Sequence, residues 1–217
     1  MTRETLKPAR IVELALEIVD REGLDALNMR RLATQAGVKP MSLYHHFPSK
    51  DAILDAVGEE LAATALADTG DAGDWQERVR VLFTELHGVV RGHPRALPLI
   101  SRAVVRTPSG RRWMEELMRT LLDAGFDPAG AAAVYHTLGA YTLGVGYAGL
   151  LSLETPLGAI TGEVALNWGD FPAMLKVGLR LAVWDHAGEF ETGLDVLLCH
   201  FAVELEASDA GAGPAGA

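Results

Sequence analysis

Residues 28–50 decide the fold, and they read NMRRLATQAGVKPMSLYHHFPSK. Asn28 is a good N-cap for a short helix that turns its apolar residues inward. Gly37 ends that helix, because glycine tolerates the left-handed backbone that a tight turn between two helices needs. Pro40 then suits the first position of a second short helix, which we expect to run through Phe47. The stretch therefore predicts a helix-turn-helix.

The second helix of this motif has the dimensions of a DNA-reading helix. It is short enough to lie in a major groove about 12 Å wide, with its N-terminal residues nearest the base edges. Leu43 faces inward, which leaves its polar neighbours free to meet bases or phosphates. Lys50 begins the next helix, where its charge and the nearby backbone amides can hold a phosphate. The predicted DNA-contacting residues are Asn28, Arg30, Lys39, Pro40, Met41, Ser42, Tyr44, His45, His46 and Lys50.

Each of these features also has a plainer interpretation. A glycine turn between two helices occurs in many all-α proteins that bind no DNA. His45 and His46 can be ordinary surface residues, and they make a poor metal pair because adjacent helical positions diverge by about 100°. The ring of Tyr44 can pack against apolar neighbours while its hydroxyl reaches a phosphate. The motif alone therefore does not establish DNA binding.

The charge of the chain is divided unevenly. The net charge of −10 taken alone argues against a nucleic-acid partner. Residues 1–50, however, hold eight Lys or Arg and six Asp or Glu, whereas residues 51–217 hold eleven and twenty-three. A small cationic unit on an acidic body is the asymmetry expected when only that unit meets phosphates.

Helical spacing continues along almost the whole chain without a convincing strand pair, so we predict an all-α fold. The polar segment 68–74 indicates a loop, and Asp127-Pro128 opens a long helix. Helical periodicity resumes near residue 170 and breaks at Gly188. We expect a helix-turn-helix domain (1–48), a linking helix capped by Ser49 (49–66), a larger helical domain (67–207) and a disordered tail (208–217).

Composition excludes several classes of protein. Cys199 is the only cysteine, which rules out an internal disulfide framework and suits a reducing cytoplasm. The uncharged stretch 128–153 is long enough to span a bilayer, but five glycines interrupt it and no basic anchors flank it. We predict a buried helix there and no membrane partner. We also expect no cofactor and no bound metal ion.

The DNA-binding motif resembles that of a known family. The run Leu43-Tyr44-His45-His46-Phe47-Pro48-Ser49-Lys50-Asp51, preceded by Arg30-Arg31-Leu32-Ala33 and Ala36-Gly37-Val38, resembles the DNA-binding domain of the tetracycline-repressor (TetR) family. Residues 140–144 and 184–198 are similar to the effector domain of that family. The resemblance covers nearly the whole chain. It implies a three-helix DNA-binding head, a ligand-binding helical body and a homodimer on a near-palindromic DNA operator.

Small residues recur every four positions in the long uncharged helix, which lets another helix approach closely. The resemblance assigns this helix and the last one to a four-helix dimer interface. A tight crossing within one chain would use the same strip. Cys199, on the last helix, is expected to be buried. The predicted interface residues are Ala140, Gly144, Ala148, Ser152, Leu194, Leu198 and Phe201.

The resemblance also implies an effector pocket in the larger domain. Family members that bind tetracycline hold a magnesium–drug chelate partly through two histidines. The positions that align here are Ile100 and Ala140, and neither can ligate a metal. We therefore expect a small, largely apolar effector other than tetracycline. The candidate pocket residues, each of which would also suit the core, are Phe83, His87, Trp113, Met114, Leu117, Met118, Tyr135, His136 and Tyr141.

These observations favour a ligand-responsive transcriptional repressor. An activator, or a regulator without an inducer, would have the same fold, and the sequence does not separate these alternatives. A helical enzyme using His87 or His136 is disfavoured, because no nucleophile, base and orienting group are apparent together. A pure protein-interaction module is disfavoured by the basic head.

Overall fold

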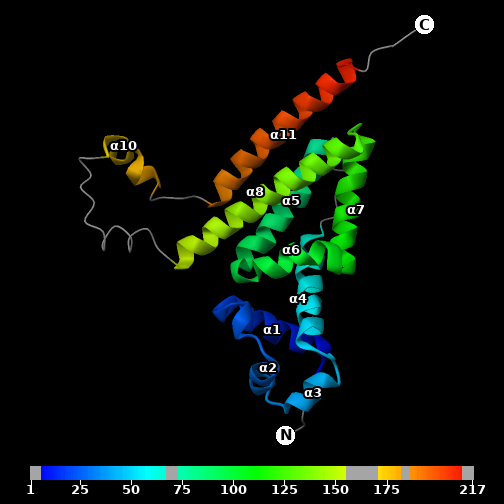
Figure 1. Cartoon of the computed structure of the whole chain (residues 1–217), viewed down its shortest axis with the longest axis vertical. Helices are drawn as coiled ribbons and strands as arrows, with labels where there is room; N and C mark the ends of the chain where they lie inside the picture. Colours follow the sequence, from blue (N-terminus) through cyan, green and yellow to red (C-terminus); the bar gives the residue numbers. More distant parts are fainter. Residues whose placement is uncertain (1–5, 67–72, 155–170, 182–185, 212–217) are drawn as a thin grey trace.

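The computed structural model describes residues 6–66, 73–154, 171–181 and 186–211. Every regular element in these ranges is a helix, which confirms the all-α prediction. Figure 1 shows a small head of N-terminal helices at one end and a larger helical body at the other, with α4 running between them. Within the described ranges, no helix combines the length and the hydropathy needed to cross a bilayer.

Three helices build the head. They are α1 (Pro8–Glu22), α2 (Met29–Gln35) and α3 (Pro40–Tyr44), with a 3₁₀ turn η1 (Leu24–Ala26) after α1. Ile11, Ile18, Leu32 and Leu43 are completely buried. Burial of each such side chain contributes about 1.5–3 kcal/mol relative to its exposure, so one shared apolar core holds the three short helices together.

Capping side chains set where the helices begin. Asn28 and Ser49 accept hydrogen bonds from the backbone N–H three residues later, at 2.9 Å and 3.1 Å, as the sequence predicted. Asp74 and Asp127 do the same at the starts of two helices of the body. Such a cap stabilises a helix by about 1 kcal/mol, which is why these boundaries could be predicted from local sequence.

The second helix of the motif is shorter than its spacing predicted. α3 ends at Tyr44 and not at Phe47. The N–H groups of His46 and Phe47 both donate to the carbonyl of Leu43 at 2.9 Å, so the chain closes into a turn. Pro48 disfavours a helical backbone at the residue before it, and the helix therefore stops early.

The linking helix α4 (Lys50–Ala65) joins the head to the body. It packs on α1 in the head and on α5 (Trp75–Gly92), α6 (Leu97–Arg106) and α7 (Pro108–Asp123) in the body. A 3₁₀ turn, η2 (Pro94–Ala96), precedes α6 and contacts α1. The body therefore holds the head through two elements, α4 and η2.

Two long helices complete the body. α8 (Pro128–Glu154) packs on α5, and α11 (His186–Gly211) lies along α8 (Figure 1). A Cβ at Gly193 of α11 would overlap the phenol of Tyr141 on α8, so glycine leaves room for that side chain between the two helices. A further helix, α10 (Pro172–Leu181), stands apart from the body in the same view.

α8 is only half buried, which corrects the prediction of a buried helix. Val134 and Leu138 point into the body, but Ala140 and Gly144 are exposed. The long uncharged sequence thus has one face in the core and one uncharged face in solvent.

α11 corrects two expected boundaries. It begins at His186, so Gly188 lies in its first turn and does not break it. It runs to Gly211, so the predicted tail at 208–217 is helical through residue 211, and 212–217 lie outside the described residues. Once a stripe anchored by Phe190 holds the helix to the body, adding residues to its end costs little. The loop predicted at 68–74 also falls largely outside the described residues.

Candidate DNA interface and effector site

The turn between α2 and α3 aims α3 outward. Gly37 has φ +67°, a left-handed conformation that favours glycine. Its N–H donates to the carbonyl of Thr34 at 3.1 Å, and the N–H of Val38 donates to that of Ala33 at 3.0 Å. These bonds satisfy the last carbonyls of α2 and hold the two helices at a fixed angle. The buried side chain of Leu43 packs α3 onto the core of the head.

Most of the predicted DNA-contacting side chains are exposed. Met41 is 66% exposed and Tyr44 is 45% exposed, which is high for large apolar side chains in a packed domain. Ser42 is half-buried. The remaining exposed members on and around α3 are Lys39, Pro40, His45 and His46. The tip of the head is therefore a protruding surface that combines cationic, aromatic and imidazole groups.

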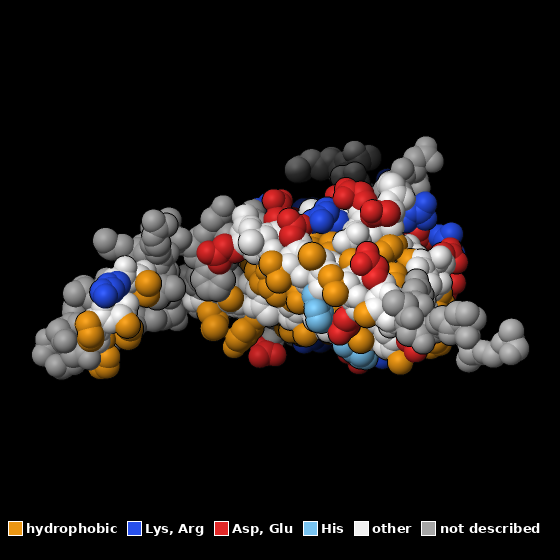
Figure 2. Space-filling view, turned by 90° about the horizontal axis from the view of Figure 1, so that it is seen from above, with side chains coloured by type: hydrophobic (Ala, Val, Ile, Leu, Met, Phe, Trp, Pro, Cys, Tyr) orange, Lys and Arg blue, Asp and Glu red, His pale blue; other side chains and the backbone are white. Residues whose placement is uncertain are grey.

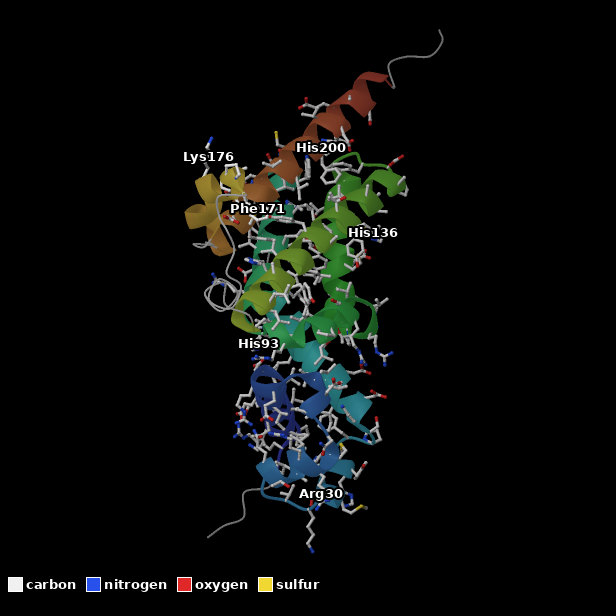
Figure 3. All side chains as sticks on the ribbon, turned by 60° about the vertical axis from the view of Figure 1, so that its left-hand side comes forward. Arg30, His93, His136, Phe171, Lys176 and His200 are labelled. Atoms are coloured by element: carbon white, nitrogen blue, oxygen red, sulfur yellow. The ribbon has the colours of Figure 1, made fainter. Side chains whose placement is uncertain are left out.

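The two predicted contacts outside α3 also lie at this end of the head. Arg30 is exposed at the end of the molecule farthest from the body (Figure 3). Lys50 is half-buried at the first position of α4, beside backbone amides that face the helix end. Asn28 is exposed, but its carbonyl oxygen is already engaged as the cap of α2. Its side-chain amide nitrogen donates to the carbonyl of Ala26 at 3.5 Å, which leaves the second N–H of that amide for a phosphate.

Ion pairs neutralise much of the acidic charge of α1. Arg10 contacts Glu13 at 2.8 Å, and Arg31 pairs with Glu22. Glu17 accepts a hydrogen bond from Gln35 at 2.9 Å. The contacts of Glu22 and Glu17 tie α1 to α2. The cations around α3 are then the charges that an approaching phosphate would meet.

Sequence reasoning missed a charged clamp between α4 and α6. Asp55 contacts Arg102 at 2.6 Å and Arg106 at 2.9 Å. The hydrogen bonds from Arg106 and Arg102 hold the pKa of the Asp55 carboxyl at about 2, although burial opposes them. Arg102 and Arg106 are one turn apart, which is a visible pattern, but their partner lies about fifty residues away in the sequence.

A second polar contact continues this clamp toward α7. Glu59, one turn after Asp55, accepts hydrogen bonds from the backbone N–H of Ser109 at 3.0 Å and from its hydroxyl at 2.7 Å. Burial works against the charged form of Glu59, but the bonds from Ser109 outweigh it and lower the pKa of the carboxyl. α4 is thus fixed to the first turn of α7 as well as to α6.

The head also contacts the body directly. The Nδ1 atom of His93 lies 2.9 Å from the Asp20 carboxylate of α1, and Arg95 donates to the carbonyl of Asp20 at 3.1 Å. Figure 3 places His93 at the junction of head and body. α1 therefore cannot shift without disturbing η2.

Several predicted pocket residues form the core of the body. Phe83 is fully buried and packs edge to face on Trp113, with ring centroids 5.3 Å apart. His87 is buried and stacks on Phe190 at 3.8 Å. Tyr141 also stacks on Phe190, with ring centroids 5.5 Å apart, and its hydroxyl donates to the carbonyl of Glu189 at 3.0 Å. Burial raises the pKa of Tyr141. Leu117 is buried, and the half-buried members are Met114, Met118 and Tyr135.

A small apolar cavity lies between α4, α5, α6 and α7. Its volume is about 20 Å³. Its walls are formed by Leu61, Ala62, Ala65, Leu86, Ile100, Ala103, Val104, Gly110 and Trp113. Within the described parts of the chain, no cluster of three or more potential metal ligands occurs. The side chains of the cavity wall are apolar except for the indole N–H of Trp113, so the cavity is suited to apolar groups.

Two predicted assignments differ from the burial of the side chains in a single protomer. His136 is exposed, because it shares the outward face of α8 with Ala140 and Gly144 (Figure 3). It therefore does not line an internal pocket, and Ala140 does not either. The predicted interface residues Leu194, Leu198 and Phe201 are buried inside the protomer, because they form the inward stripe of α11.

The outward face of α8 is uncharged, and that of α11 exposes apolar side chains beside Glu189 and His200. Tyr147 is 54% exposed on α8, and Val196 and Val203 are 64% and 60% exposed on α11. Cys199, which was expected to be buried, is exposed between these two valines. Figure 2 views the end of the body away from the head and shows hydrophobic side chains gathered there with histidines among them. We call the set Ala140, Gly144, Tyr147, Leu151, Val196, Cys199 and Val203 the outer face.

Comparisons with family models cover most of the chain. A model described as bacterial regulatory proteins, tetR family, matches residues 11–57. A second, described as tetracyclin repressor-like, C-terminal domain, matches residues 68–199. The two matches correspond to the head with part of α4 and to the body.

Two curated proteins illustrate the similarity. The class A tetracycline repressor protein from transposon 1721 of Escherichia coli is 31% identical over 207 residues, with 89% of each chain covered. The transcriptional repressor DrrR1 of Streptomyces coeruleorubidus is 33% identical over 135 residues, which cover 61% of this chain. That match spans 50% of DrrR1, so the chain corresponds to about half the length of this relative.

Solved structures share the fold. A possible TetR family regulator from Streptomyces coelicolor A3(2) has 30% identity and a TM-score of 0.76, with 91% of this chain and 99% of that chain covered. ActR from Streptomyces coelicolor, in complex with actinorhodin, has 28% identity and a TM-score of 0.69 over 96% and 99%. BioQ, with its natural double-stranded DNA operator, has 27% identity and a TM-score of 0.60 over 84% and 98%.

Proposed function

The chain belongs to the TetR family of bacterial transcriptional regulators and is not an enzyme, and from this premise we propose that it is a ligand-responsive repressor. In this proposal a homodimer binds a near-palindromic operator through the two α3 helices. A small, largely apolar molecule other than tetracycline releases it from the DNA. The observation that carries the proposal is the protruding tip of the head, where Tyr44 of α3 is exposed beside Lys39, which precedes the helix.

The operator contacts follow from the geometry of the head. α3 is short, is held rigidly by the turn at Gly37, and presents its N-terminal residues outward, as a helix in a major groove does. Lys50 and the backbone amides at the start of α4 suit a phosphate. The DNA-bound structure of the similar protein BioQ supports this assignment.

The homodimer is proposed from the outer face. A solvent-exposed helix surface normally carries charged residues, whereas the outward side of α8 has none between residues 128 and 153. A Cβ added at Gly144 would meet nothing within 4 Å, so this strip is open in the protomer and free for a second copy. Pairing α8 and α11 with their copies would make a four-helix interface. Two heads would then meet half-sites about 34–36 Å apart.

The effector response is proposed to act through α4. This helix carries the head at one end and lines the apolar cavity with Leu61 and Ala65 near its other end. A ligand can shift the balance of conformations only by its different affinity for them. A molecule that fits best when α4 has moved would therefore favour a conformation in which the distance between the two heads no longer matches the operator half-sites. The ligand-bound structures of ActR support a small-molecule effector.

Selection of bound fragments from random duplex DNA with the purified protein tests the operator proposal. We expect enrichment of a near-palindromic sequence, and we expect a reporter under that sequence to be silenced when the protein is present. Activation of the reporter would instead favour the alternative function, a transcriptional activator with the same fold. Recovery of unrelated sequences at physiological salt would refute sequence-specific DNA binding.

Head variants test which residues meet the DNA. We expect Tyr44→Ala and Lys50→Ala each to weaken binding to the selected operator in a gel-shift assay, by roughly 5- to 30-fold if each removes 1–2 kcal/mol of phosphate or base contact. The dependence of affinity on salt should also become shallower for Lys50→Ala, because one phosphate contact is lost. Lys176→Ala is the matched control, since it removes one exposed positive charge from α10. Equal affinities for all three variants would contradict the placement of the head on DNA.

A further inference from the structure

The indole of Trp113 is a buried donor without an acceptor. Its side chain is 3% exposed, and Nε1 has no hydrogen-bond partner within the described part of the chain. Buried tryptophan N–H groups usually find a partner, because an unpaired one loses its hydration without compensation. Phe83 packs edge to face on the ring at 81°, which fixes its orientation in apolar surroundings. The donor is therefore held ready for an acceptor that this protomer does not supply.

Trp113 lines the small cavity described above, and the composition of the cavity wall makes water a poor occupant. A volume of about 20 Å³ has room for one water molecule. A buried water needs two to four polar partners, however, and no other polar side chain lines the wall. An apolar molecule with one acceptor atom matches this wall better than water does.

We propose that the effector binds at this cavity and is an apolar molecule with a carbonyl-type oxygen that accepts a hydrogen bond from Trp113 Nε1. This inference rests on the proposed function, because it names the chemistry of the effector. The carbonyl oxygen provides the specificity. A hydrocarbon of the same shape would leave the indole unpaired and would bind less tightly.

The cavity must enlarge to admit such a molecule, and its wall indicates where it opens. Ala62 and Ala65 of α4 line the cavity together with Ala103 of α6 and Gly110 of α7, so each of these three helices contributes a small residue to the wall. Small side chains have fewer dispersion contacts to lose when helices separate. Opening here displaces α4 from α6 and α7, and α4 carries the head. The Asp55 clamp joins α4 to α6 and therefore resists that movement.

Matched probes test the proposal directly. 1-Indanone and indane have nearly the same shape, and only the ketone can accept a hydrogen bond. In ¹H–¹⁵N spectra of the full chain, the chain's four tryptophans give separate indole N–H resonances. The resonance of Trp113 is identified by its loss in Trp113→Phe. We expect this resonance to move downfield with 1-indanone and not with indane. A resonance that stays in place, or moves equally with both probes, overturns the proposal.

An isosteric variant separates the hydrogen bond from the packing. Replacing Trp113 by 3-benzothienylalanine exchanges the N–H for sulfur and keeps the ring shape, so it also serves if Trp113→Phe does not fold. We expect it to bind 1-indanone about fivefold less tightly and indane unchanged. Thr120→Val is the control, because Thr120 has another buried hydroxyl without a partner in the described chain, outside the cavity wall. It should leave both affinities unchanged. Equal affinity of the isosteric variant and wild type for 1-indanone would overturn the proposal.

Failure of this inference is distinguishable from failure of the proposed function. A protein that binds its selected operator but whose Trp113 resonance ignores 1-indanone is a repressor with a different effector site. If the Trp113 resonance shifts with 1-indanone but no operator is selected, the protein has the ligand site and lacks the proposed function. The two measurements use different molecules and can fail independently.

Discussion

At the scale of the residue, Gly110 determines how closely α6 and α7 approach each other. Glycine is often required because it adopts a left-handed backbone. In the structure Gly110 lies in the first turn of α7 and is not among the described residues with positive φ. It is needed for a different reason. A Cβ there would overlap the backbone of Ala103 and Val104 in α6.

We predict that Gly110→Ala lowers the free energy of unfolding by about 2 kcal/mol or more, because backbone atoms cannot rotate away as a side chain can. Gly88→Ala is the matched control, since a Cβ at this exposed position of α5 meets nothing within 4 Å. It should raise the free energy of unfolding by about 0.5–1 kcal/mol through better helix propensity. Urea denaturation of the two variants measures both effects, and a Gly110→Ala protein as stable as wild type would contradict the close approach.

At the scale of the element, the contact of α4 with α6 is the mechanical link between body and head. Asp55 bridges Arg102 and Arg106, and the side chains that carry the bridge are about a third to a half exposed. Exposed pairs contribute little individually, but two arginines on one carboxylate fix the relative position of two helices. We therefore assign the clamp chiefly to holding α4 in register.

The clamp predicts a specific dependence of stability on pH. The pKa of Asp55 is about 2 in the folded protein and 3.8 ordinarily. A depressed pKa means that the pair stabilises the fold above about pH 4 and that this contribution is lost as the pH falls toward 2. Asp55→Asn removes the contribution at every pH. The difference in free energy of unfolding between wild type and variant should therefore be constant from pH 7 to about pH 4 and shrink below it.

A double-mutant cycle with Arg106→Gln checks that the effect belongs to the clamp. Adding Arg106→Gln to Asp55→Asn should change stability at pH 7 by less than Arg106→Gln does in the wild type, because their shared interaction is already gone. A pH-independent difference between wild type and Asp55→Asn down to about pH 2.5, or full additivity in the cycle, would argue against the clamp.

At the scale of the whole molecule, the outer face leaves large apolar side chains exposed in a lone protomer. Large exposed apolar patches on soluble proteins usually mark an interface. The outer face extends over two adjacent helices, α8 and α11, and the body behind it is well packed. A second copy that covers it would also set the distance between the two heads.

We predict that Val203→Arg yields a monomer in light scattering coupled to size-exclusion chromatography, because a guanidinium in a packed interface loses its hydration without a partner. Operator affinity should fall with it, since one head meets only one half-site. Val105→Arg is the matched control, because Val105 is 72% exposed on α6, away from the outer face. A wild-type protein that is already monomeric would refute the homodimer, and so would a Val203→Arg protein of unchanged mass.

Much of the head could be predicted from sequence because its structure depends on neighbours a few residues apart. Asn28, Ser49 and Asp127 cap helices as expected, and Gly37 makes the turn. α3 was predicted too long because periodicity alone ignores the restraint that Pro48 places on Phe47. The exposure of the predicted DNA-contacting side chains follows from that same local geometry.

The dimer residues show where sequence reasoning stops. α11 has two apolar stripes, one through Leu194 and Leu198 and one through Val196 and Val203. Both have helical spacing, so periodicity cannot say which stripe faces the body. The resemblance assigned the first to the interface, but packing on α5 and α8 buries it within the protomer.

The sequence by itself determined the helical class, the caps and turns, and a cationic head on an acidic body, because each depends on contacts within a few residues or on composition alone. Only the tertiary structure decided which face of each helix is inside, that Asp55 meets two arginines from α6, and that the Trp113 donor is buried without a partner. These three features depend on how helices far apart in the chain pack together. Whether a helix surface is buried depends on the shapes of all the helices that pack around it.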